Sequence, residues 1–247
     1  MICFLGPGDL ALVAAIVSLA ACAQMVSGFG FALMAVPLMG LAIDLKTAVV
    51  ISTICGTASN TYQAINDGHH RDPRLVRLLT VTSFVGMPFG LVVLDRLDID
   101  VLRVAIGLFV LVALAGVLRT NSAIAVGGRL LEGIAGFVSG ILATSTSTNG
   151  PPLVLLLRSR GLTPEVFRAT INTVFSIVAF VSILMFAIGG RLTTEVLVGT
   201  LVAVPGLGIG MFIGSRVRGA LAPPVFWRIV AGLLTATAIS SIVSGLL

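Results

Sequence analysis

Charged residues are scarce in this sequence. Only 10% of its 247 residues are Asp, Glu, Lys or Arg, whereas 57% are hydrophobic, and ordinary soluble domains carry roughly 25% charged residues. This composition excludes an ordinary soluble domain and predicts a polytopic membrane protein. The net charge of +5 arises from basic residues in short loops, a pattern that orients membrane proteins. Nucleic-acid binding is therefore not expected.

Side chains for metal binding and catalysis are also few. The three cysteines are scattered without the spacing of a metal site and are interpreted as small apolar packing residues. His69 and His70 lie in a polar loop, where adjacent positions do not readily converge on one ion. No Asp or Glu lies inside an apolar segment, so a conventional proton relay is not expected, and the hydroxyls around Ser145 have no nearby base. The sequence predicts no enzyme, no metal site and no cofactor.

The sequence instead contains eight long intervals without Asp, Glu, Lys or Arg. A bilayer core of about 30 Å needs about 20 apolar residues in helical form, so these intervals predict about eight transmembrane helices and an all-α polytopic fold. They run over 10–43, 47–66, 78–94, 104–118, 133–157, 169–190, 196–215 and 229–247. The connections between them are too short for a soluble domain, so residues 1–247 are expected to form a single membrane transport domain.

The start of the chain and its loops bear on orientation in the membrane. No basic stretch precedes the first apolar interval, which is also too long for a signal peptide, so we expect it to be retained as a span. If all eight segments cross, the loops after the odd-numbered spans hold nine Lys and Arg residues and the opposite loops hold six. This difference favours both termini outside the cytoplasm.

The interval 133–157 is not expected to form one continuous helix. Its middle, residues 144–152, reads TSTSTNGPP, and Pro151 and Pro152 have no N–H to donate. In hydrocarbon every backbone polar group needs a partner, so a break here has to be shielded by protein or face water. The helix ends at such a break present free N–H groups and partial positive charge, which favour an anion.

The two halves of the chain align weakly with each other. Residues 86–90 (GMPFG) align with 206–210 (GLGIG), and their glycines are interpreted as positions where helices pack closely. Gly28 and Gly30 in the first interval take the place of the break within 144–152. Interrupted hydrophobic segments in matching positions of two halves are the best sequence pointer to the binding site of a transporter.

This alignment predicts two four-span repeats, over about 9–119 and about 123–247, with the first and fifth segments broken at mid-membrane. Four spans in each repeat imply two copies in the same orientation. A broken segment that returns to the side from which it entered would instead give inverted copies.

The predicted binding site lies between the two breaks. Neutral hydrogen-bond donors and at most one Arg suit a small oxyanion, whereas a divalent cation prefers carboxylates. Arg168 is interpreted as an electrostatic attraction for the anion or, alternatively, as a contact to lipid phosphate. Asn60 and Asn172 fit a ligand contact and an interhelical hydrogen bond equally well. The candidate substrate-binding residues are Gln24, Ser27, Gly28, Gly30, Asn60, Thr146, Ser147, Thr148, Asn149, Gly150, Pro151, Arg168 and Asn172.

With these residues identified, the chain resembles the sulfite exporter TauE/SafE family. The resemblance is carried by Gly28, Gly30 and Pro37, by NGPPLVLLL (149–157), by FRATINTVF (167–175) and by GHHRDPR (68–74). It implies an eight-span carrier of the prokaryotic inner membrane, built by duplication, that handles sulfite, thiosulfate-like ions or organosulfonates such as sulfoacetate and sulfolactate. Phe29 and Phe31 depart from the glycine-rich break that is common in the family.

Together, the residues and the resemblance predict a secondary transporter that exports small sulfur-containing anions such as sulfite or organosulfonates. The alternative is an uptake permease or a channel for another small anion. The expected partners are a small anionic substrate and the lipid bilayer of the cell inner membrane. A homodimer is left open.

Overall fold

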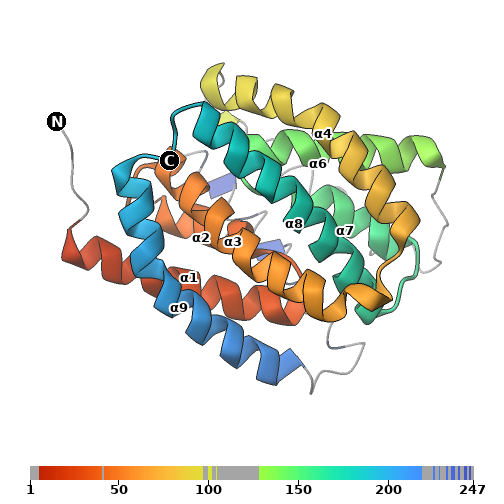
Figure 1. The fold of residues 1–247 in the computed structure, drawn as a ribbon, viewed down its shortest axis with the longest axis horizontal. Coiled ribbons are helices and arrows are strands. Elements are labelled where there is room, and N and C mark those ends of the chain that lie inside the picture. The colour runs from red at the N-terminus through yellow and green to blue at the C-terminus, as the bar shows by residue number, and fades with distance from the viewer. Residues whose placement is uncertain are drawn as a thin grey trace.

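The computed structural model describes residues 6–40, 42–96 and 128–218, residues 100, 101 and 104, and scattered positions between 225 and 245. Over these residues it is all-helical, in agreement with the predicted fold class, and Figure 1 shows the arrangement. The helices are α1 (Pro7–Ser27), α2 (Phe31–Met39), α3 (Leu45–Asp67), the short 3-10 helix η1 (Gly68–His70), α4 (Pro73–Arg96), α6 (Arg129–Ser145), α7 (Gly150–Ser159), α8 (Pro164–Ile188) and α9 (Thr194–Arg218). The predicted span 104–118 is described only at residue 104, and the predicted span 229–247 only at scattered positions, so neither prediction is tested.

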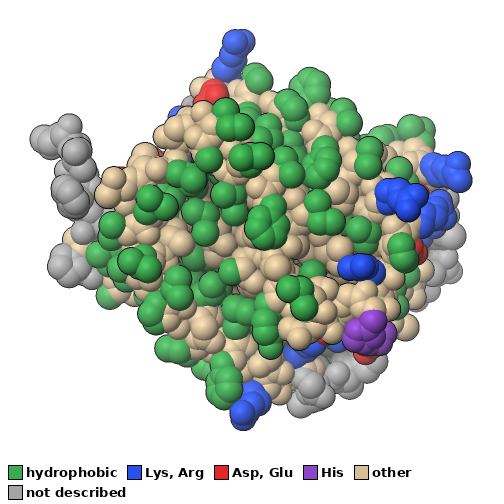
Figure 2. Space-filling view, viewed as in Figure 1, with side chains coloured by type: hydrophobic (Ala, Val, Ile, Leu, Met, Phe, Trp, Pro, Cys, Tyr) green, Lys and Arg blue, Asp and Glu red, His purple; other side chains and the backbone are tan. Residues whose placement is uncertain are grey.

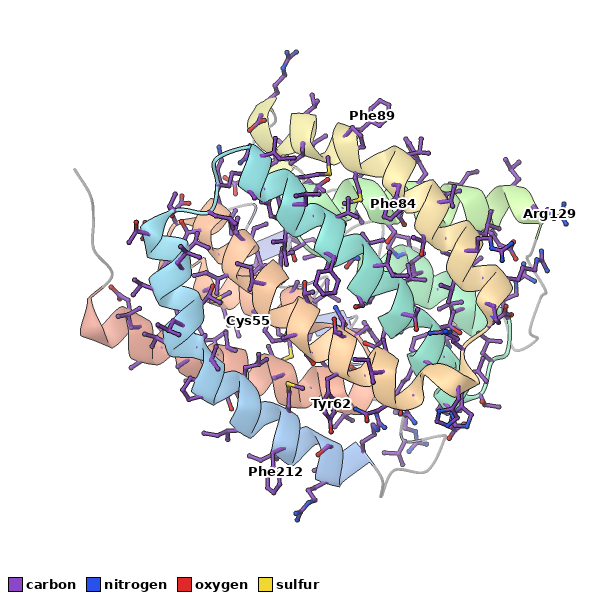
Figure 3. The ribbon with its side chains drawn as sticks, viewed as in Figure 1. Cys55, Tyr62, Phe84, Phe89, Arg129 and Phe212 are labelled. Carbon is purple, nitrogen blue, oxygen red and sulfur yellow. The ribbon has the colours of Figure 1, made fainter. Side chains whose placement is uncertain are left out.

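Four of the described helices, α1, α4, α8 and α9, are long and apolar enough to cross a membrane. Large hydrophobic side chains cover their outer faces. Phe89 on α4 is 56% exposed and packs edge-on against Phe137 of α6. Phe212 on α9 is 59% exposed and points away from the neighbouring helices in Figure 3. Figure 2 shows hydrophobic side chains spread over the visible face, with Lys and Arg mostly near its margins. An apolar exterior of this extent suits contact with lipid.

Helices α3 and α8 lie side by side at the centre of the fold (Figure 1). Thr61 Oγ1 is 2.7 Å from Ser176 Oγ, and the N–H of Asp72, just beyond η1, donates to Thr170 Oγ1 at 3.0 Å. Later residues of α3 and η1 thus meet earlier residues of α8, so the two helices run antiparallel. The inner face of α3 buries hydroxyl and amide side chains, and this makes α3 less apolar than its neighbours.

Glycines bring two further pairs of helices into close contact. Gly86 and Gly90 on α4 lie against backbone carbonyls of α6, while Gly206 and Gly210 on α9 lie against backbone carbonyls of α1. A Cβ at any of the four positions would overlap the neighbouring backbone. The interpretation of these glycines as helix-packing positions is therefore confirmed.

Helices α6 and α7 form a hairpin, called here the second hairpin, with residues 146–149 as the second bend. The buried carboxylate of Glu132, in the first turn of α6, forms an ion pair with Arg160, which directly follows α7. The outer ends of the two helices therefore meet. Ser147 in the second bend has φ of 59°, a left-handed conformation that residues other than glycine seldom adopt.

Helices α1 and α2 form the first hairpin, with residues 28–30 as the first bend. Gly28 and Gly30 have φ of 83° and 95°, in the left-handed region that favours glycine. Val13 of α1 and Val36 of α2 belong to the same buried cluster. A straight helix would separate two residues 23 positions apart by about 34 Å, so α2 folds back beside α1.

Candidate functional site

A polar cavity lies where the two bends meet the central helices α3 and α8. Its volume is about 40 Å³. Roughly 10–15 Å³ is enough for one water molecule, so the cavity has room for about three waters or for an ion of about four heavy atoms. The residues that line it are Gln24, Gly30, Phe31, Ala32, Leu33, Ser52, Thr53, Gly56, Asn60, Ala143, Ser147, Thr148, Asn149, Gly150, Phe175, Ala179 and Ser182.

The first hairpin brings the start of a helix to the cavity. Helix α2 begins at Phe31, and the first bond back to its cap runs from Met34 N to Gly30 O. The N–H groups of residues 31–33 precede the first intrahelical bond, so they have no acceptor within the helix. All three residues line the cavity. Helix starts carry partial positive charge, so this wall is suited to an anion.

The second hairpin supplies polar side chains instead of a full set of N–H groups. Helix α7 begins at Gly150, and Pro151 and Pro152 follow at once, so only one of its first three residues has an N–H. The neighbouring Ser147, Thr148 and Asn149 line the cavity with two hydroxyls and an amide. These side chains provide hydrogen-bonding groups at the end of a helix whose prolines remove two backbone donors.

The central helices complete the walls. Ser52, Gly56 and Asn60 recur at intervals of four residues along α3, so they share one face of the helix. Thr53 on the same side places its Oγ1 at 2.9 Å from Ser147 Oγ, which connects α3 to the second bend. Helix α8 contributes Phe175, Ala179 and Ser182 to the opposite side.

None of the described residues that line the cavity carries a charged side chain. A bound anion would therefore be held by neutral hydrogen-bond donors and by the start of α2 rather than by a cation. Arg168, the predicted electrostatic attraction, does not line the cavity. Its stem packs against the first bend, because a Cβ on Gly28 would lie 2.5 Å from Arg168 Cγ.

The structure brings seven of the predicted site residues together around the cavity: Gln24, Gly30, Asn60, Ser147, Thr148, Asn149 and Gly150. The other six do not line the cavity, and they are Ser27, Gly28, Thr146, Pro151, Arg168 and Asn172. Ser27 Oγ donates to Phe29 O at 2.6 Å within the first bend, and Asn172 Nδ2 donates to Arg168 O at 2.8 Å along α8. For all thirteen residues, a role in binding substrate stays a prediction.

Sequence reasoning missed the lining residues on α3 and α8 other than Asn60. A signal for part of this set was present, because Ser52, Gly56 and Asn60 form a regular series of small or polar residues within the apolar interval 47–66. Such a series marks one helical face. Phe175 and Ala179 carry no comparable signal, since both are apolar residues within an apolar interval.

The helical array, its apolar exterior and the polar cavity between two hairpins define a multi-pass membrane protein of the transporter type. The particular family follows from comparison of the sequence with known proteins. The profile of the family described as "Sulfite exporter TauE/SafE" matches residues 13–241, so this chain belongs to that family.

A curated relative supports the same assignment. The chain is 26% identical over 219 residues to a "Probable sulfite/organosulfonate exporter TauE" of Cupriavidus necator, and the match covers 85% of each protein. No solved structure matches the chain.

Proposed function

We propose that this protein is a secondary transporter that exports small sulfur-containing anions, such as sulfite or organosulfonates, across the cell inner membrane. The observation that carries the proposal is the cavity between the two bends, which combines the free N–H groups at the start of α2 with neutral side-chain donors and lacks charged side chains among its described lining. Membership of the family and the name of the curated relative support the class of substrate.

The size of the cavity favours the smallest members of this class. Sulfite has four heavy atoms and fits a space of about 40 Å³, which corresponds to about three waters. A larger organosulfonate would exceed this volume. We therefore rank sulfite ahead of sulfoacetate and sulfolactate as the substrate of the conformation described here.

The proposal includes inverted rather than parallel repeats. The outer end of the second hairpin lies beside the start of α4, where Glu132 contacts Arg74, and Thr170 places the start of α8 at the same end of the molecule. Val13 of the first hairpin belongs to a cluster with Phe186, near the other end of α8. Two hairpins that enter from opposite faces and meet at one cavity suit a carrier in which each face has its own path to a shared site.

Counterflow in proteoliposomes tests the proposed function. We expect vesicles loaded with unlabelled sulfite to accumulate labelled external sulfite transiently, with flux that saturates as the concentration rises. A linear flux without counterflow would identify a channel, and vesicles oriented in the two directions would distinguish export from uptake. The absence of transport of every sulfur anion tried would overturn the proposal.

Two matched substitutions connect transport to the cavity. Thr53 and Thr57 are buried on α3, and each donates its hydroxyl to a carbonyl one turn earlier, Val49 O and Thr53 O respectively, but only Thr53 lines the cavity. We expect Thr53→Val to reduce sulfite counterflow about fivefold, because it removes the bond to Ser147 that connects α3 to the second bend and a hydrogen bond contributes about 1 kcal/mol. Thr57→Val should transport normally. Equal activity of the two variants would remove the cavity from the transport path.

A further inference from the structure

Two amide side chains face the cavity as a bonded pair. Gln24 on α1 donates from Nε2 to Oδ1 of Asn60 on α3, and both residues line the cavity. Gln24 is only 1% exposed, and its Oε1 has no hydrogen-bond partner among the described residues. A buried acceptor without a partner is unusual in a folded protein, so this oxygen indicates a ligand that can donate to it.

The chemistry of the pair does not depend on which amide donates to the other. Each primary amide has one carbonyl oxygen and one NH₂ group. Once one oxygen and one NH₂ group are engaged with each other, one oxygen and one NH₂ group are left. The pair therefore always presents a hydrogen-bond acceptor beside a donor.

A fully ionised oxyanion has only acceptors, so it would place an oxygen against this carbonyl. A singly protonated oxyanion instead donates its O–H to the amide oxygen and accepts bonds from the remaining donors. We propose that the cavity selects a small, singly protonated oxyanion through the Gln24–Asn60 pair. This inference rests on the proposed function, and for that substrate class it assigns hydrogen sulfite as the bound form rather than the sulfite dianion or sulfate.

The other groups around the pair agree with recognition of a monoanion. Ser52 lines the cavity with a buried hydroxyl that has no partner among the described residues. The titratable side chains on the surrounding helices include Cys22 on α1, Cys55, Tyr62 and Asp67 on α3, Arg168 on α8 and Arg218 on α9, and none of them lines the cavity. No described lining cation is available to neutralise a second negative charge.

Binding of three ligands to the purified protein tests the proposal without any variant. Calorimetry would compare sulfite, sulfate and methanesulfinate one pH unit below and one unit above the second ionisation of sulfite. Methanesulfinate is a pyramidal monoanion with a methyl group in place of the hydroxyl of hydrogen sulfite, and it does not titrate in this range. We expect sulfite to bind about tenfold more weakly at the higher pH, because the fraction of hydrogen sulfite falls about tenfold. Methanesulfinate should bind equally at both pH values and at least tenfold more weakly than hydrogen sulfite, since it leaves the acceptor unpaired.

Substitution of the pair tests its role. The double change Gln24→Met with Asn60→Leu should bring the affinities for hydrogen sulfite and methanesulfinate within about twofold of each other, because it removes both amide oxygens. Gln24→Met alone would leave Asn60 Oδ1 as a free acceptor. Gln63→Met is the matched control, since Gln63 is equally buried on α3 but does not line the cavity. We expect that variant to keep the wild-type preference.

The outcomes separate this inference from the proposed function. Methanesulfinate or sulfate binding as tightly as hydrogen sulfite, or sulfite binding that is the same at both pH values, would overturn the selection of a protonated ligand while leaving sulfite transport intact. A preference that persists in the double variant would overturn the role of the pair. A wild-type protein that binds none of the anions at either pH would overturn both proposals.

Discussion

Arg218, the last residue of α9, donates two hydrogen bonds to Asp67, the last residue of α3, with Nη–Oδ distances of 2.8 and 2.9 Å. A second ion pair joins Arg191, just after α8, to Asp95 near the end of α4. The first pair connects the central helix α3 to α9, which follows α8 in the chain. The second pair connects the end of the central helix α8 to α4, which follows α3. In the first pair the central helix supplies the acid, whereas in the second it supplies the base.

Reversal of the charges tests whether the Asp67–Arg218 pair holds α3 to α9. Both side chains are about one-fifth exposed, so Asp67→Asn should destabilise the protein by about 1 kcal/mol, between the values for exposed and buried pairs. This corresponds to a fall in melting temperature of about 2–4 °C in detergent. The double change Asp67→Arg with Arg218→Asp should recover part of the loss. No recovery would show that the contact is geometric rather than electrostatic.

The buried carboxylate of Glu132 is expected to depend unequally on its two arginine partners. Glu132 is fully buried and pairs with both Arg160 and Arg74, whose side chains are 25% and 61% exposed. Arg160→Ala should cost about 3 kcal/mol, because removal of the better-buried partner leaves Glu132 poorly compensated. Arg74→Ala should cost less than about 1 kcal/mol. Thermal unfolding of both variants in one detergent measures the difference, and equal losses would contradict the unequal contributions.

Two glycines on α9 predict opposite effects of the same substitution. A Cβ on Gly210 would overlap the backbone of α1, whereas nothing lies within 4 Å of a Cβ on Gly208. Gly210→Ala should therefore separate the helices and cost about 1–3 kcal/mol, as overpacking does. Gly208→Ala should stabilise α9 by about 0.5–1 kcal/mol, since alanine favours the helix. Unfolding temperatures of the two variants decide the matter, and a stable Gly210→Ala protein would be inconsistent with this contact.

The left-handed conformation of Ser147 predicts that stability and transport respond differently to substitution. Ser147→Gly should raise stability by about 1 kcal/mol, because glycine adopts a φ of 59° without strain. Ser147→Ala keeps the strained backbone and should not gain this stability. Both variants lose the hydroxyl that contacts Thr53, so both should transport sulfite more slowly. A gain in stability from alanine as well as glycine would contradict the assignment of strain.

The helical class could be predicted from the sequence because long intervals without charge have few alternatives in a membrane protein. The helix ends near the second bend were also accessible, since α6 ends at Ser145 and α7 begins at Gly150, within the stretch that precedes Pro151 and Pro152. The two prolines lack a backbone N–H, and this local property can be recognised from the sequence alone.

The direction in which α7 runs could not be predicted from the same stretch of sequence. An interval with Glu132 before it and Arg158 after it has the same pattern whether the chain crosses the bilayer or turns back. The pairing of Glu132 with Arg160 and the bond from Ser139 Oγ to Asn149 O show that the chain turns back. The position of Arg168 was missed for a similar reason, because it depends on the packing of its stem against Gly28 in a distant part of the chain.

The two prolines at the start of α7 make the cavity chemically asymmetric. The wall formed by α2 offers peptide N–H groups, which every residue except proline possesses whatever its side chain. The facing wall relies on the hydroxyls and the amide of residues 147–149. Point substitutions in the second wall can therefore retune which solute is accepted over evolutionary time, while attraction for negative charge persists at the first wall through almost any change of side chain.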